Sequence, residues 1–158
     1  MKSKEKTLSL NRKALYLYFI KDKFEAGVVL TGEEVKSVRK GNIDINAAFV
    51  VEKHRELYLI NAAIAKYSKT THTEHEEKRH KKLLLHKRQI NKIIDNIKAP
   101  KYSAIVLRVY TSSRNKIKLE IAIVCGKSGI DKRAAIKERE WRREKAQLLK
   151  TNKHIHPT

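Results

Sequence analysis

The stretch YSAIVLRVYTSSRNKIKLEIAIVC, residues 102–125, predicts a β-hairpin and fixes the fold class. Two apolar runs flank the polar residues 112–115, which mark the turn between two antiparallel strands. In the second run apolar and charged residues alternate with a period of two, as in a strand with one buried face. The polar side of this strand carries Lys116, Lys118 and Glu120, and the buried side carries Ile117, Leu119, Ile121 and Ile123.

Upstream of this hairpin the sequence predicts more short strands of the same kind. Residues 16–29 form a strand interrupted by the charged segment KDKFE, and residues 43–64 form two strands joined by a loop at residues 53–56. About six short antiparallel strands result, linked mostly by hairpins. This pattern favours a mainly β fold, a six-stranded antiparallel OB-like barrel with peripheral helices, over a sandwich.

Two segments carry helix signals. In GEEVKSVRKG, residues 32–41, the acidic Glu33 and Glu34 fall in the first turn, where the helix dipole favours them, and Gly41 ends the helix. In KLLLHKRQINKIIDNIK, residues 82–98, apolar residues recur at helical spacing from Leu83 onward. We predict an amphipathic helix over this second segment.

The last part of the chain has a helix-forming composition without an apolar face. Residues 134–150 are good helix formers, but Trp141, Leu148 and Leu149 make only a thin apolar stripe. We predict a basic tail that is disordered alone and helical on an acidic partner, because an isolated helix of this length is marginal in water. A solvated helix of alternating charge is the alternative. The predicted regions are a flexible N-terminus at 1–10, a barrel at 11–126 and the tail at 127–158.

The net charge predicts the kind of partner. The 158 residues carry a formal charge of +20, and such an imbalance is normally relieved by a polyanion, so nucleic acid is the leading partner. An anionic membrane is the second option, but no apolar run approaches ~18 residues and no lipidation motif is present. With no apolar core of a secretory signal and Cys125 as the single cysteine, we expect a cytoplasmic chain without disulfides.

Candidate residues for catalysis or metal binding are few. His72, His75 and His80 lie in the polar segment 65–80, but their spacing matches no closed metal site and no nucleophile is tied to them. Residues 126–128, GKS, lack the upstream glycine of a phosphate-binding loop. We therefore expect no catalytic residue, no metal and no cofactor.

One carboxylate is unusual because its neighbours are apolar. Glu25 lies in FEAGVVL, where a charged group usually pairs with Lys or Arg or accepts hydrogen bonds from backbone N–H groups. From the residues alone, structural pairing and an RNA-facing role are both open for Glu25.

Several motifs between about Leu10 and Lys150 together resemble one family. They are LNRKA-x-x-x-YFI, FEAG, GEEVKSVRKG, KLLLHKR and, most specifically, GK-x-x-x-DKR-x-x-IKEREW. This set resembles SmpB, the small protein B that partners transfer-messenger RNA (tmRNA) in bacteria. The resemblance implies that the barrel, as a monomer, binds the tRNA-like domain of tmRNA and enters a stalled ribosome with it. The tail would then occupy the empty decoding site and the mRNA channel, against small-subunit rRNA, so that trans-translation tags the peptide and rescues the ribosome.

The resemblance also implies roles for individual residues. Tyr18 can stack on an unpaired base, although Tyr in a strand and Leu84 are more often packing residues. Ile130 departs from the family, in which an aromatic residue or His is common at this position. The implied RNA-binding residues are Asn11, Arg12, Tyr18, Glu25, Leu84, Lys116 and Gly126. The implied ribosome-interacting tail residues are Asp131, Lys132, Arg133, Lys137, Arg139, Trp141, Leu148 and Leu149.

Two rival classes of protein stay open from the sequence. A ribosomal or assembly protein would bind rRNA permanently in a structural role, and a nuclease would use the histidine-rich loop. Deleting the tail separates the first rival from an RNA adaptor, since an assembly protein would show ribosomal subunit defects. Replacing the three loop histidines together by Ala tests the second rival.

Overall fold

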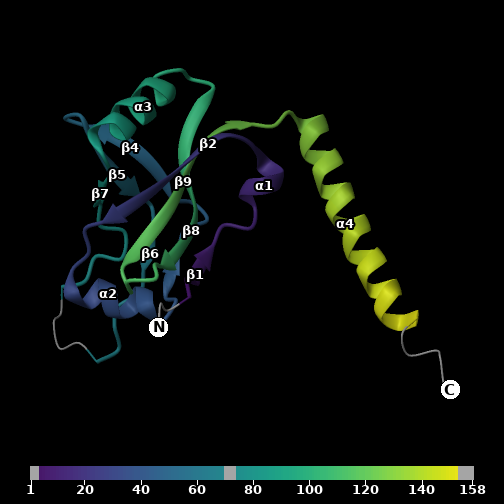
Figure 1. Cartoon of the computed structure of the whole chain (residues 1–158), viewed down its shortest axis with the longest axis horizontal. Helices are drawn as coiled ribbons and strands as arrows, with labels where there is room; N and C mark the ends of the chain where they lie inside the picture. Colours follow the sequence, from purple (N-terminus) through teal and green to yellow (C-terminus); the bar gives the residue numbers. More distant parts are fainter. Residues whose placement is uncertain (1–3, 70–73, 153–158) are drawn as a thin grey trace.

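The central element of the fold is the predicted hairpin, formed by strands β8 (Tyr102–Thr111) and β9 (Ile117–Gly126) (Figure 1). The two strands pair along their whole length, with one bulge between Val106 and Arg108 on β8. In the turn, Asn115 takes a left-handed backbone conformation with φ of 60°. The sequence prediction of this hairpin is confirmed.

The structure is a computed structural model that describes residues 4–69 and 74–152. In its last helix the described side chains are those of residues 133–150. Among the residues described, no helix has the length and the apolar character needed to cross a membrane.

Six strands close into a ring. Strand β2 (Tyr18–Val28) pairs with β9, β7 (Lys81–Leu84) with β2, β5 (Glu56–Ile60) with β7, and β4 (Phe49–Lys53) with both β5 and β8. Because β8 also pairs with β9, the order β8-β4-β5-β7-β2-β9 returns to its start, and every pairing is antiparallel. Closure removes the unpaired edges that an open sheet would present. The prediction of a mainly β, six-stranded antiparallel barrel is confirmed.

Three further strands lie beside this ring. Strand β1 (Lys6–Leu10) pairs with residues 108–111 of β8, whereas β3 (Ile43–Asp44) and β6 (Ala63–Ile64) form a separate two-stranded sheet. The expectation of a loose N-terminus therefore does not hold for β1, because its ladder with β8 fixes the backbone. Its sequence, KTLSL, has only two apolar residues, so the strand is recognisable only from its partner.

Helix α2 (Gly32–Arg39) begins and ends where the sequence predicted. The Thr31 hydroxyl accepts a hydrogen bond from the Glu34 N–H at 3.3 Å, and the Glu34 carboxylate accepts one from the Thr31 N–H at 3.1 Å. This reciprocal pair satisfies two backbone donors that the first turn would otherwise leave open. Past the other end, Gly41 has φ of 81°, a left-handed conformation that favours glycine.

A buried ionic cluster joins α2 to strand β7, and the sequence analysis missed it. Arg79 donates to Oε1 of the buried Glu34 through Nε at 3.0 Å and Nη2 at 2.7 Å. The fully buried Lys81 places its ammonium 3.9 Å from Glu34 Oε2 and donates to the carbonyls of Ala62 and Arg79. Burial raises the pKa of Glu34, but hydrogen bonds from Arg79 and Thr31 outweigh it and lower that pKa overall. Glu34 is therefore the ionised centre of the cluster.

Helix α3 (Lys87–Ile97) is shorter than the sequence predicted. Residues 82–84, which we assigned to its start, belong to strand β7 and pair with β5 and β2. Leu83 is buried inside the ring, because its position suits the inward face of a strand as well as it suits a helix period. The helix begins only after His86 and packs on β8 and β9. Its fully or nearly fully buried residues are Ile93 and Ile94.

Two apolar clusters hold the barrel together. The larger fills the ring and includes the predicted inward residues Leu119, Ile121 and Ile123 of β9. The smaller lies on the outer face, where α1 (Ala14–Leu17) covers Ile105, Leu107, Ala122 and Val124. The end of β9 is therefore buried on both faces, which explains its continuous apolar run IAIVC.

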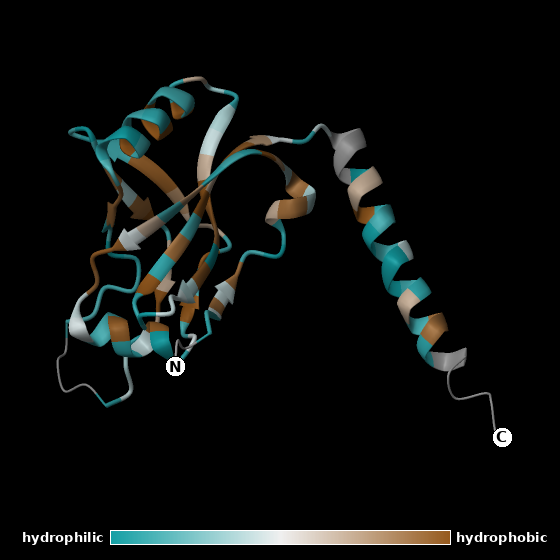
Figure 2. Cartoon of the chain, viewed as in Figure 1, coloured by the Kyte–Doolittle hydropathy of each residue, from teal (hydrophilic) through white to brown (hydrophobic). Residues whose placement is uncertain are grey.

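The last helix, α4 (Gly129–Asn152), projects away from the barrel (Figure 1). Its contact with the rest of the protein is made chiefly through α1, where the Arg139 guanidinium lies 5.2 Å from the centre of the Tyr16 ring. Figure 2 shows that α4 is mostly hydrophilic, with isolated hydrophobic positions, in contrast to the strands of the barrel. Residues 134–150 are thus helical in the chain alone, with Trp141 61% exposed and without a packed apolar face. The disorder that we predicted for the free tail stays a prediction.

Candidate RNA interface

A ladder of paired charges crosses the outer face of β8, β9 and β2. Arg108 donates through Nε to Glu120 at 2.7 Å, and the Lys23 ammonium lies 3.3 Å from the other oxygen of Glu120. Nη2 of Arg108 also lies 3.4 Å from Glu5. Burial raises the pKa of Glu120, but the hydrogen bonds from Arg108 and Lys23 lower it overall. Glu120 therefore stays ionised at neutral pH and holds two cations in defined positions.

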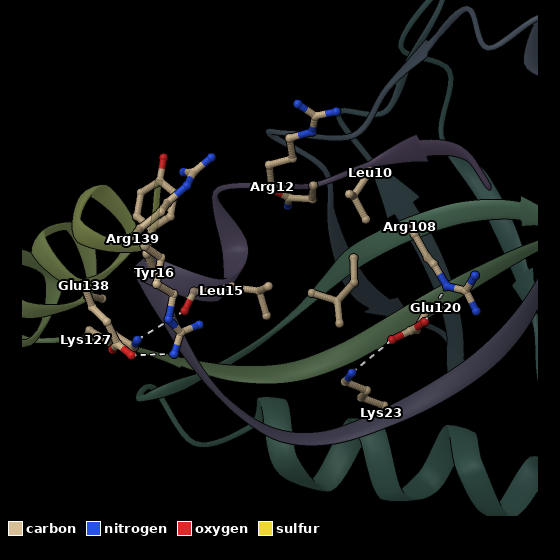
Figure 3. Close-up of a pocket in the computed structure, with 14 residues that line it drawn as sticks. Leu10, Arg12, Leu15, Tyr16, Lys23, Arg108, Glu120, Lys127, Glu138 and Arg139 are labelled. Atoms are coloured by element: carbon tan, nitrogen blue, oxygen red, sulfur yellow. Dashed lines mark hydrogen bonds and ion pairs between the residues drawn. The ribbon is translucent and has the colours of Figure 1, made fainter. Parts of the chain in front are cut away.

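Beside this ladder lies a cleft of about 580 Å³ between the barrel, α1 and α4 (Figure 3). On one side Tyr16 of α1 lies beside Glu138 and Arg139 of α4, and on the other side lie Lys23, Arg108 and Glu120 of the barrel (Figure 3). Apolar lining comes from Leu10, Leu15, Leu107 and Ala135. The cationic lining residues are Arg12, Lys23, Arg108, Lys127, Arg139 and Arg142.

Backbone and ion-pair contacts fix the walls of the cleft. Lys127, which links β9 to α4, donates through its backbone N–H to the Leu17 carbonyl at 3.0 Å and through its ammonium to the Leu15 carbonyl at 3.2 Å. On α4, Arg142 donates to Glu138 at 2.5 Å, one turn away. The Lys127 contacts fix the link before α4 to α1, whereas the Arg142–Glu138 pair lies within α4.

The electrostatics of the cleft favour an anion. Six cationic side chains line it against two carboxylates, Glu120 and Glu138, and each carboxylate is already paired with a cation. The cations can neutralise phosphates, while the apolar lining of the cleft contacts a ribose or a base. The cleft is therefore suited to a segment of nucleic acid.

Two predicted RNA-binding residues, Asn11 and Arg12, line this cleft. Asn11 is buried: its backbone N–H donates to the Leu107 carbonyl at 2.7 Å and its Nδ2 to the Val106 carbonyl at 3.3 Å. Its Oδ1 is also buried and has no hydrogen-bond partner within the described part of the chain. Arg12 is exposed at the rim of the cleft (Figure 3).

Tyr18 and Gly126 are brought together as partners at one end of the β2–β9 ladder. Tyr18 is half-buried and packs on the apolar cluster under α1, so the structure gives it a packing role. Gly126 is exposed at the end of β9, and a Cβ at this position would meet open space. A close backbone approach by a ligand can use this space.

The other predicted RNA-binding residues lie toward the opposite end of the hairpin. Glu25 is exposed on β2, where its carboxylate accepts a hydrogen bond from the Tyr110 hydroxyl and lies 4.0 Å from Lys118. Leu84 is exposed at the end of β7, opposite Gly27 of β2, and Lys116 is exposed just before β9. The predicted set thus divides into one group at the cleft and a second beyond the charge ladder.

The predicted tail residues are spread along α4. Arg139 faces the barrel over Tyr16, whereas Arg133, Lys137 and Trp141 are exposed. Leu148 and Leu149 are also exposed, near the far end of the helix. Asp131, Lys132 and Ile130 lie within α4, and their side chains are outside the described residues.

The histidines of the polar loop do not form a metal site in the part of the chain that is described. One ring nitrogen of His75 lies 2.8 Å from the Ile64 carbonyl, His80 is exposed, and His72 lies outside the described residues. Across residues 4–69 and 74–152, no group of three or more His, Cys, Asp or Glu could hold a metal ion.

Sequence reasoning missed several residues of the interface. Alternation along β9 placed Glu120 outward, but nothing in the sequence indicated that Arg108 and Lys23 are its partners from neighbouring strands. Tyr16 and Arg142 become neighbours of the cleft only because α4 starts beside α1. The available signal was the isolated Arg within the apolar run YSAIVLRVY, a cation on an otherwise buried strand.

The fold and the site together define a class of protein: a closed antiparallel barrel with a cationic outer face and a projecting basic helix, suited to binding a nucleic acid. The family model described as SmpB protein matches residues 8–151. The chain therefore belongs to the SmpB family.

Individual relatives cover nearly the whole chain. An SsrA-binding protein from Wolbachia sp. subsp. Drosophila simulans (strain wRi) is 49% identical over 142 residues, which is 90% of this chain and 95% of that relative. One from Rickettsia bellii (strain OSU 85-389) is 42% identical over 146 residues, covering 92% and 97%. A chain of the solved structure "tmRNA-SmpB: a journey to the center of the bacterial ribosome" matches with a TM-score of 0.66 and 32% identity, covering 81% of this chain and 93% of that chain.

Proposed function

We propose that this protein binds the tRNA-like domain of tmRNA and delivers it to stalled ribosomes for trans-translation, in which the ribosome is rescued and the nascent peptide is tagged. The observation that carries this proposal is membership of the SmpB family over residues 8–151. The relatives at 49% and 42% identity are SsrA-binding proteins, and the solved structure that resembles this fold contains tmRNA, SmpB and the ribosome in its description.

The proposal divides the work between the barrel and α4. The barrel binds the folded RNA through Asn11, Arg12 and Gly126 near the cleft and through Glu25, Leu84 and Lys116 beyond the charge ladder. Tyr18 supports this surface by packing under α1. Because phosphate contacts release counterions, the affinity for tmRNA falls steeply with salt concentration.

The helix α4 works on the ribosome. Its 24 residues span about 36 Å at 1.5 Å per residue, enough to extend from the decoding site into the mRNA channel. Its cations balance the phosphates of small-subunit rRNA, and its exposed Trp141, Leu148 and Leu149 provide apolar contacts there. Away from the ribosome this helix is only marginally stable, since an isolated helix without a packed face is marginal in water. The Asp131-Lys132-Arg133 triplet at the start of the helix acts at this stage.

In this function the protein is a monomeric adaptor without catalysis, metal or cofactor. It acts in the cytoplasm, where the ribosomes are. The SmpB family is an RNA-binding family, and a cationic surface that binds RNA needs no catalytic group.

Truncation after Ser128 tests the division of work. We expect the truncated protein to keep its affinity for the tRNA-like domain of tmRNA, measured by filter binding, and to lose peptide tagging on ribosomes stalled without a codon. Replacing Asp131, Lys132 and Arg133 together by Ala should give the same result in the full-length chain. As a matched control, Lys98→Ala, just after the end of α3, removes an exposed cation that belongs to neither the cleft nor α4 and should change neither measurement.

Two other outcomes would contradict the proposal in different ways. If the truncated protein lost tmRNA affinity as strongly as tagging, the division between barrel and tail would be wrong. If cells carrying the truncation accumulated incomplete ribosomal subunits while tagging continued, the protein would be an assembly factor for rRNA.

A further inference from the structure

Both sides of the cleft beside α1 carry more cations than carboxylates (Figure 3). The side formed by α4 has Arg139 and Arg142 with the carboxylate of Glu138. The charged residues of the opposite side come from the barrel and from the segment before α1: Arg12, Lys23, Arg108 and Glu120. Like charges on two facing sides repel each other. The docked position of α4 is therefore weakened unless an anion lies between the two sides.

Within the described part of the chain, the contacts that hold α4 beside α1 are weak. The Arg139 guanidinium lies 5.2 Å from the centre of the Tyr16 ring, a cation–π contact at the surface of the molecule. The hydrogen bonds of Lys127 to carbonyls of α1 fix only the link before the helix. The Arg142 side chain is 74% exposed, and its ion-pair partner Glu138 belongs to α4 itself. The direction of α4 can therefore change at a small cost in free energy.

A segment of RNA in the cleft would contact both sides. The cleft encloses about 580 Å³, which lies within the ~300–1,000 Å³ of pockets that hold drug-sized ligands. It therefore has room for a short single-stranded segment and not for a double helix. The phosphates of this segment can neutralise cations on both sides, and the exposed Leu10 and Leu15 offer an apolar surface to a ribose or a base. The RNA would thus replace the repulsion between the two sides by attraction.

We propose that RNA bound in the cleft is held by Arg139 and Arg142 of α4 as well as by the barrel, and that it thereby docks the first turns of α4 against α1. This inference rests on the proposed tmRNA-binding function. The direction in which α4 leaves the barrel is then set when tmRNA binds, before the ribosome is reached. Leu148 and Leu149 do not line the cleft, so the far end of the helix stays available to the ribosome.

This coupling does not make α4 essential for RNA affinity. RNA binding and docking of α4 favour each other by the same factor, because the two equilibria are linked. If α4 is docked in about a tenth of the free molecules and RNA tightens docking about tenfold, α4 raises the RNA affinity only about twofold. Truncation after Ser128 then leaves RNA affinity nearly unchanged. The population of docked α4 is therefore the quantity to measure.

Double electron–electron resonance between two spin labels on the full-length chain measures this population. In a Cys125→Ser background, Glu140→Cys places one label on α4 and Lys98→Cys places the other just after α3. Both positions are exposed, and neither lines the cleft. Without RNA we expect a broad distribution of distances. With the transcribed tRNA-like domain of tmRNA, a single narrow distance should grow from about a tenth to about half of the molecules.

Arg142→Gln and Arg143→Gln form a matched pair of variants. Each removes an exposed cation from α4, but of the two only Arg142 lines the cleft. Neither change touches the contact between Arg139 and Tyr16. With RNA bound, the narrow distance should fall to about a quarter of the molecules in Arg142→Gln and stay at about half in Arg143→Gln. Filter binding should give both variants RNA affinities within about twofold of the wild type.

Three results would overturn the inference while the proposed function stands. They are an unchanged distribution of distances when RNA binds to the wild type, a broader distribution in the complex, and equal narrow populations in the two arginine variants. A broader distribution would mean that RNA displaces α4 from the cleft. If the wild-type protein does not bind the tRNA-like domain at all, the proposed function itself fails.

Discussion

The barrel and the helix α4 use the same kinds of residue in opposite ways. In the barrel, Leu119 and Ile121 are buried inside a closed ring, and even the charged Lys81 is fully buried beside Glu34. Along α4, Leu148 is 65% exposed and the described charges point mostly into solvent. The barrel thus satisfies its own side chains, whereas α4 leaves its side chains available for a partner.

This difference assigns stability to one region and adaptability to the other. A barrel that buries its core can keep a fixed RNA-binding surface under a net charge of +20. A helix that buries little apolar surface is only marginally stable by itself, so its structure can depend on the partner that it binds. If this reading is right, substitutions should have large effects on the stability of the barrel and small effects when they fall on α4.

The largest effect is expected from Glu34→Gln in the barrel. This change leaves the buried Lys81 and its neighbour Arg79 without their counter-charge, so the free energy of unfolding should fall by about 3–5 kcal/mol. Urea denaturation followed by circular dichroism measures it. Glu56→Gln is the control, because its partner Lys82 is exposed, and it should have little effect. Equal stability of Glu34→Gln and wild type would show that the cluster is unimportant.

The same cluster predicts a direction for the effect of pH. Because the pKa of Glu34 is lowered in the folded state, its stabilisation is fully present above the ordinary value of 4.5 and is lost as the pH falls through the folded-state value. The free energy of unfolding of the wild type should therefore decrease in acid below about pH 4.5. In Glu34→Gln this part of the decrease should be absent, so the two proteins should become more alike as the pH falls.

The next effect compares one substitution in the two regions. Leu119→Ala removes a buried side chain from β9 and should lower the free energy of unfolding by about 2–5 kcal/mol. Leu148→Ala removes an exposed side chain from α4 and should change it by less than about 0.5 kcal/mol. Thermal unfolding of the two variants measures the contrast. Comparable losses would mean that α4 packs on the barrel in solution and would remove the distinction.

The sequence predicted the secondary structure correctly where the local pattern of residues agrees with the fold. The hairpin of β8 and β9 followed from its alternation, and α2 followed from Thr31, its two acids and Gly41. The pattern failed at residues 82–84, since three leucines after two lysines suit a helix and a buried strand equally well. These residues form a strand because they pair with β5 and β2, and the local sequence carries no information about this pairing.

The positive charge of the candidate interface could be predicted from the sequence, but its geometry could not. The resemblance to the SmpB family implied Asn11, Arg12 and Glu25 as RNA-binding residues, but it did not give the side chains that they contact. Their surroundings depend on contacts across the ring, such as Tyr110 with Glu25, which are 85 positions apart in the chain. The buried Lys81 was hidden for the same reason, because a lysine in a run of cations gives no sign that Glu34 will meet it.

The smallest effect concerns the contact between α4 and α1 of the barrel region. Tyr16→Leu keeps an apolar side chain on α1 but removes the ring beneath Arg139, a cation–π contact worth about 0.5–1 kcal/mol at an exposed site. Because this contact orders α4 and not the ring, amide hydrogen exchange should become faster in residues 133–150 and stay unchanged in β8 and β9. Arg139→Gln should reproduce the result from the other partner. If Tyr16→Leu instead lowered the melting temperature of the barrel with no change in α4, then α1 would support the barrel alone, and α4 would be independent of it from its first turn.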